Sequence, residues 1–67
     1  MSNLAPHQQR VVDEKAALDE KIALLTQFIA GSQVFGGLPL DERGRLKRQR
    51  LAMIEYSDIL GERIAAF

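Results

Sequence analysis

Five basic side chains within eight residues are the feature of the sequence best suited to binding chemistry. They are Arg43, Arg45, Lys47, Arg48 and Arg50. The cluster follows a glycine-rich segment, where a helix is expected to begin and to add free backbone N–H groups. Guanidinium groups bind phosphate through paired hydrogen bonds. The cluster therefore suits a phosphorylated ligand, and the alternative is a solvated surface that pairs with acids such as Asp41 and Glu42.

Arg45 and Gln49 are four residues apart, which places them on one face of a helix beside Leu46 and Met53. Symmetric copies that meet at this face would each add an arginine and a glutamine to a shared pocket. Such a pocket would suit a ligand with repeated phosphates and base edges. In the alternative interpretation, Gln49 only caps a layer of the core.

Two aromatic side chains could stack on a base: Phe35 in the glycine-rich segment and Tyr56 further along the chain. Aromatic residues at core spacing more often pack inside a protein. Both interpretations, stacking and packing, are compatible with the pattern.

Residues suited to catalysis do not form a recognisable set. His7 is expected to be a solvated residue in the first turn of a helix. The neighbouring acids Asp13 with Glu14, and Asp19 with Glu20, point about 100° apart on a helix and do not form a dyad. We therefore expect a binding protein with no catalytic residue, no metal site and no cofactor, rather than an enzyme.

Length and composition further limit the kinds of protein that this chain can be. The chain has 67 residues, no cysteine and one histidine, so neither disulfides nor a structural metal can supplement a small core, and oligomerisation remains. Nine basic and nine acidic side chains cancel, which argues against a long nucleic acid as partner. No apolar run approaches the ~20 residues of a membrane span, and no leader peptide is recognisable. We expect a cytoplasmic protein with no membrane partner.

The turn signals predict one domain with two helices. The domain covers 1–67, with helix one at about 5–30, a turn at 31–38 and helix two at about 39–66. Pro6 fits the first turn of a helix after possible caps at Ser2 and Asn3. Gly31 is expected to end helix one in the left-handed conformation. Pro39, which two acids follow, is expected to start helix two.

Both helices carry a wide apolar face. The main stripe of helix one is Val11, Leu18, Ile22, Leu25 and Ile29. The main stripe of helix two is Leu46, Gln49, Met53, Tyr56, Leu60, Ile64 and Phe67. Leu51 and Ile54 project from another sector, so the chain has more apolar surface than one hairpin buries. Gly61 costs a helix about 1 kcal/mol relative to alanine, which predicts that a second backbone approaches it.

These features predict an all-α fold: an antiparallel two-helix hairpin that assembles into a symmetric homo-oligomeric helical bundle. Four segments also carry a family resemblance. They are the run from Gln9 to Ile22, the run from Leu25 to Ile29, the turn Phe35-Gly-Gly-Leu-Pro39, and the spaced set Gln49, Met53, Tyr56, Ile59, Leu60, Arg63 and Ile64. Together they resemble the helical-hairpin domain of phage anti-CBASS and Thoeris anti-defence proteins, over nearly the whole chain.

The resemblance implies a homo-oligomer, typically a hexamer, that acts as a sponge in the host bacterial cytoplasm. Such sponges sequester cyclic oligonucleotide immune signals without cleaving them. Their cyclic trinucleotides lie in three-fold pockets lined by an arginine and its neighbours on the second helix. This implies a role for Arg45 and Gln49, with Arg48 as the alternative arginine.

One departure from the family concerns its longer members. Their N-terminal segment adds an aromatic residue and a lysine to separate pockets for cyclic dinucleotides or cyclic ADP-ribose isomers. This chain begins almost at the hairpin, so those pockets are expected to be altered or missing. The nearest substitutes are His7, Arg10 and Lys15.

Two other functions fit parts of the pattern. A small phage structural or adaptor protein would use the extra apolar faces to bind another polypeptide, and it predicts no nucleotide binding. A helical-hairpin nucleic-acid binder would use the basic cluster, and it predicts binding to long DNA or RNA that weakens steeply with salt.

Overall fold

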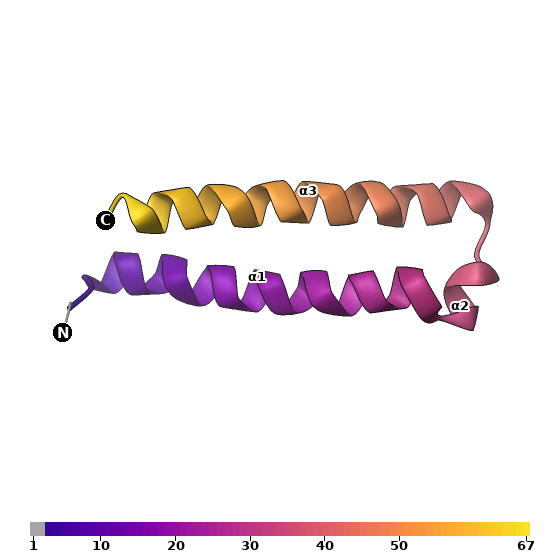
Figure 1. Cartoon of the computed structure of the whole chain (residues 1–67), viewed down its shortest axis with the longest axis horizontal. Helices are drawn as coiled ribbons and strands as arrows, with labels where there is room; N and C mark the ends of the chain where they lie inside the picture. The colour runs from indigo at the N-terminus through magenta and orange to yellow at the C-terminus, as the bar shows by residue number, and fades with distance from the viewer. Residues whose placement is uncertain (1–2) are drawn as a thin grey trace.

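Two long helices form an antiparallel hairpin in the computed structural model, which describes residues 3–67 (Figure 1). Helix α1 covers Pro6–Gly31, the short helix α2 covers Gln33–Gly36, and helix α3 covers Leu40–Ala65. Helices α1 and α3 lie side by side, and the start of α1 and the end of α3 lie at the end of the hairpin away from α2. The hairpin measures 48 × 16 × 14 Å, so most side chains lie close to solvent.

The start of α1 differs from the sequence-based expectation. Pro6 is the first helical residue, and Ala5 is the capping residue. The backbone N–H of Ala5 donates a hydrogen bond to Oε1 of Gln8 at 2.9 Å, which closes the first turn. Asn3 precedes this cap and does not fill its place, so that prediction was wrong. The other predicted cap, Ser2, lies outside the described residues.

The turn contains a helix that the glycine pattern did not predict. No glycine among residues 3–67 has a positive φ, so the left-handed conformation expected for Gly31 was wrong. The chain instead bends at Ser32, which has an extended backbone with φ −84° and ψ 130°. The Ser32 hydroxyl accepts a hydrogen bond from the Val34 N–H at 3.1 Å and thereby starts α2.

The start of α3 follows the prediction closely. Pro39 is the capping residue, and its carbonyl accepts a hydrogen bond from the Arg43 N–H at 3.0 Å. Asp41 and Glu42 lie in the first turn, where their charge is favourable next to the positive end of the helix dipole.

A narrow apolar core joins the two long helices. Its buried members are Val11, Leu18 and Leu60, with Ile22, Met53 and Ile64 packed against them. Leu60 is fully enclosed. Tyr56 and Phe67, from the predicted main stripe of helix two, stay 43% and 45% exposed. The stripe is therefore only partly covered within one chain.

Several large apolar side chains have no cover within the hairpin. The most exposed are Leu24, Val34, Leu40, Leu51 and Ile59. Over residues 3–67, no helix is both long and apolar enough to span a bilayer. Each of these five side chains is open to solvent in a single copy of the chain.

Candidate functional site

The five cations of the basic cluster divide between two faces of α3. Arg43, Lys47 and Arg50 are spaced by four and three residues, so they share the face that lies beside α1 and the turn. Arg45 and Arg48 are three residues apart on a different face. We call this second face, with Gln49 beside it, the outer face. One run of charge in the sequence thus produces two separate surfaces.

The cations on the inner side all contact the rest of the hairpin. Arg43 Nε donates a hydrogen bond to the Leu38 carbonyl at 2.8 Å, which holds the turn against α3. Lys47 Nζ lies 6.0 Å from the centre of the Phe35 ring. Arg50 Nε donates to the Thr26 hydroxyl at 2.7 Å. These cations therefore help to place α3 against the turn and α1.

The cations of the outer face are open to solvent. Arg45 Nε lies 2.8 Å from Glu42 Oε1, and Arg45 Nη1 lies 3.7 Å from Asp41 Oδ2. The Arg45 side chain is still 57% exposed in these pairs. Arg48 is exposed, and Gln49 is an exposed neighbour whose Nε2 contacts Met53 Sδ at 3.9 Å. Because exposed ion pairs contribute only about 0–1 kcal/mol, a phosphate can replace these acids on Arg45.

The other two predicted ligand residues lie elsewhere in the hairpin. Phe35 is 8% exposed and packs edge-to-face on Phe28, with ring centres 5.9 Å apart. Lys15 lies on α1 near the middle of the hairpin, where its Nζ donates to Asp19 and to the Ser57 hydroxyl. Within one chain, the structure brings Arg45, Arg48 and Gln49 to one face but does not bring Phe35 or Lys15 to it.

A polar cluster that the sequence analysis missed lies between α1 and α3. Lys15 Nζ donates to Ser57 Oγ at 2.8 Å and pairs with Asp19 at 2.9 Å, while the buried Ser57 hydroxyl donates to Asp19. The hydrogen bond from Ser57, and then the one from Lys15, hold the pKa of Asp19 below its ordinary value. The Lys15 and Asp19 spacing was visible in the sequence, but their partner on α3 was not.

The Lys15 side chain of this cluster also lies next to Gly61. A Cβ at this position would lie 3.4 Å from Lys15 Cε, so the neighbour of Gly61 within the chain is a lysine side chain. The expected approach of a second backbone was wrong for the single hairpin. Gly61 therefore lies beside the lysine whose Nζ reaches Ser57.

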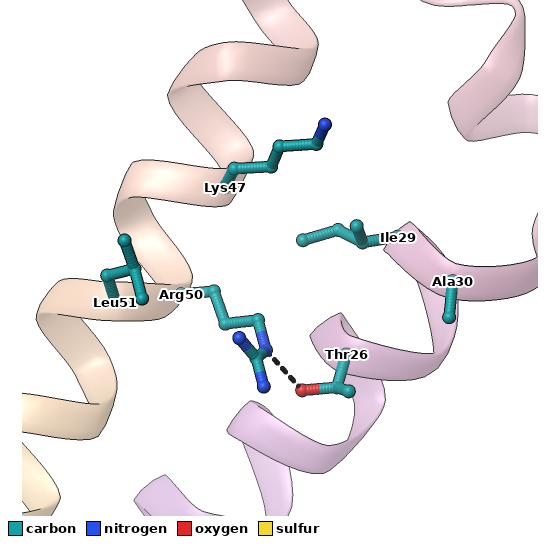
Figure 2. Close-up of a pocket in the computed structure, with 6 residues that line it drawn as sticks. All are labelled: Thr26, Ile29, Ala30, Lys47, Arg50 and Leu51. Atoms are coloured by element: carbon teal, nitrogen blue, oxygen red, sulfur yellow. Dashed lines mark hydrogen bonds between the residues drawn. The ribbon is translucent and has the colours of Figure 1, made fainter.

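A groove of about 420 Å³ lies between the end of α1 and the first half of α3 (Figure 2). Its lining residues are Thr26, Ile29, Ala30, Lys47, Arg50 and Leu51. Figure 2 shows Lys47 and Arg50 extending from α3 toward α1, and Ile29 extending toward them. The groove has apolar walls with two cations along one side.

Acidic and imidazole side chains do not gather into a metal-binding group anywhere in the described chain from Asn3 to Phe67. His7 is exposed at the start of α1. The outer face offers ionic contacts to a ligand, and the groove offers ionic and apolar contacts.

Comparison with protein families matches residues 5–66 to the Sequestin family. Comparisons with curated proteins and with solved structures gave no match. The matched range includes all three helices, and therefore both the outer face and the groove. The family's name denotes sequestration, which agrees with the resemblance to anti-defence sponges and with binding rather than catalysis. The chain belongs to the Sequestin family.

Proposed function

We propose that this chain is a phage anti-defence sponge, which binds cyclic oligonucleotide immune signals in the bacterial cytoplasm and releases them unchanged. Its ligands are cyclic di- and trinucleotides of CBASS-type signalling, together with cyclic ADP-ribose isomers. The observation that carries this proposal is the Sequestin match over residues 5–66. The exposed cations of α3 supply the phosphate-binding chemistry that this function needs.

The outer face is the proposed ligand surface. Arg45 and Arg48 offer guanidinium groups, and the Gln49 amide can both donate to and accept from a base edge. The side chains of these residues are exposed within one hairpin, so a single copy surrounds no ligand. Copies arranged around a symmetry axis would enclose one, which is why the proposal includes a homo-oligomer, a hexamer in the resembling family.

The exposed apolar side chains support self-association. Leu24 and Leu40 are 60% and 77% exposed, so one hairpin leaves these two apolar side chains uncovered. In the proposed assembly, these side chains pack between copies. Phe35 and Lys15 are further proposed ligand contacts, and both would have to exchange their present partners within the chain for a ligand.

Calorimetric titration with a cyclic trinucleotide tests the proposal. We expect saturable binding by the wild-type protein and a loss of affinity of at least about tenfold in Arg45→Gln, since one charge-assisted hydrogen bond is removed. Arg63→Gln is the matched control, because Arg63 is also exposed on α3 but lies at its opposite end. A folded wild-type protein that gives no heat with any cyclic nucleotide would favour the adaptor alternative.

A further inference from the structure

We propose that the groove between α1 and α3 is a second ligand site, separate from the outer face, which binds a nucleoside monophosphate unit. In this site Lys47 and Arg50 hold the phosphate, and the apolar wall of Ile29, Ala30 and Leu51 holds the base. The lining residues of the groove define this site independently of the function proposed for the outer face.

The charge of the groove is not neutralised within the hairpin. Over residues 3–67, neither Lys47 nor Arg50 forms an ion pair with a carboxylate. Arg50 uses Nε on the neutral hydroxyl of Thr26, which itself donates to the Ile22 carbonyl at 2.7 Å. The hydroxyl thereby fixes the guanidinium, and its two Nη groups stay available for an acceptor. Two uncompensated cations beside an apolar surface favour an anionic ligand.

The walls of the groove define the rest of the ligand. Ile29 and Ala30 at the end of α1 and Leu51 on α3 are the apolar residues of the lining, and Leu51 is 62% exposed. A volume of about 420 Å³ lies within the usual range for small-molecule sites. A flat apolar ring would cover Leu51 and Ile29 while its phosphate reaches the cations, and a nucleoside monophosphate combines these two parts.

Stoichiometry separates this site from the outer face. All six lining residues belong to one hairpin, so every chain carries a complete groove. We therefore expect one nucleoside monophosphate per chain, in any oligomer. A ligand shared by copies around a symmetry axis would give a smaller ratio of ligand to chain.

The test is a titration of the full chain with 5′-AMP, compared with adenosine and with inorganic phosphate. We expect one AMP per chain, bound more tightly than either fragment. Lys47→Gln should weaken AMP binding at least about tenfold, whereas Arg48→Gln, with the same change of charge at the adjacent residue, should leave it within about twofold. Leu51→Asp, at an exposed position, is a second variant that should also weaken AMP binding through charge repulsion.

The two proposals fail in different ways. If AMP does not bind, or if Lys47→Gln and Arg48→Gln weaken AMP binding equally, the groove is not a nucleotide site. That result leaves the proposed binding of cyclic trinucleotide through Arg45 standing. If adenosine or phosphate alone binds as tightly as AMP, the combined site is also overturned. If AMP binds as expected but cyclic trinucleotide does not, only the sponge proposal fails.

Discussion

Ser57 is a buried hydroxyl in the seam between two helices, and it is stabilised there by two charged residues of α1. Lys15 Nζ donates to the Ser57 hydroxyl, the hydroxyl donates to Asp19, and Lys15 also pairs with Asp19 along α1. A buried polar group without such partners would cost about 1–3 kcal/mol. The cluster therefore favours the register in which Ser57 lies opposite Lys15 and Asp19.

Acid should weaken the hairpin through this cluster. The folded chain holds the pKa of Asp19 below its ordinary value of 3.8, mainly through the hydrogen bond from Ser57. Its contribution to stability is therefore complete at a pH well above 3.8 and is lost as the pH falls through the lowered pKa of the folded state. Urea denaturation at a series of acid pH values should show a smaller loss of stability in Asp19→Asn than in the wild type.

Asp58→Asn is the control for that experiment, since Asp58 is an exposed carboxylate on α3. It should keep the acid dependence of the wild-type protein. The same acid dependence in Asp19→Asn as in the wild type would show that the Ser57 hydrogen bond does not stabilise the Asp19 carboxylate.

At the scale of the elements, α3 contains two glycines in different surroundings. A Cβ at Gly44 would meet nothing within 4 Å, whereas one at Gly61 would touch Lys15 Cε at 3.4 Å. Both positions have helical backbones with no positive φ. Alanine therefore relieves the conformational cost of glycine at both positions, and at Gly61 its methyl group would also contact a neighbouring side chain.

Chemical denaturation should show that both substitutions stabilise the hairpin. Gly44→Ala is expected to raise the free energy of unfolding by about 1 kcal/mol, the difference in helix propensity. Gly61→Ala should give at least as large a gain, because its methyl group would also make an ordinary van der Waals contact with Lys15 Cε, at 3.4 Å. A loss of stability in Gly44→Ala would mean that another copy of the chain packs closely on that glycine, and would contradict the open surface of the single hairpin.

Local sequence signals predicted much of the hairpin. Pro6 and Pro39 predicted the starts of both long helices to within a residue. Proline favours these positions because its φ is already helical and the first turn of a helix does not use the backbone N–H that proline lacks. The central core, with Leu18 and Leu60, followed from apolar periodicity. The helix α2 was missed because its start depends on one hydrogen bond to the Ser32 side chain rather than on glycine.

The candidate site was predictable only in part. The spacing of Arg45, Arg48 and Gln49 along one helix placed them together from the sequence alone. The groove could not be predicted this way, since Thr26 and Arg50 meet only once the register between α1 and α3 is known. The partition of the cations into two faces was visible in their spacing, but which face lies beside α1 was not.

At the scale of the whole molecule, the hairpin is thin and its core is small. Its cross-section is 16 × 14 Å, and Leu60 is the large side chain that is completely enclosed among residues 3–67. Conformational entropy costs about 1–2 kcal/mol for each ordered residue, and so narrow a core offsets little of it. Burial of Leu24 and Leu40 between copies would supply the missing apolar contacts.

Stability should therefore depend on protein concentration. When folding is coupled to association, the thermal midpoint rises with the concentration of the chain. Circular dichroism melts over a wide dilution series, with the mass measured by light scattering at each concentration, should show this rise. A concentration-independent midpoint together with the mass of a single 7.5 kDa chain would contradict the oligomer.

Recovery of the ligand tests the central claim, sequestration without chemistry, most directly. The purified protein is saturated with a cyclic trinucleotide, separated from free ligand, incubated, and denatured by heat, and the released nucleotide is identified by chromatography and mass spectrometry. The sponge account predicts that the bound cyclic trinucleotide is recovered intact in full. Recovery of linear or hydrolysed nucleotide, or the absence of any bound nucleotide, would contradict it.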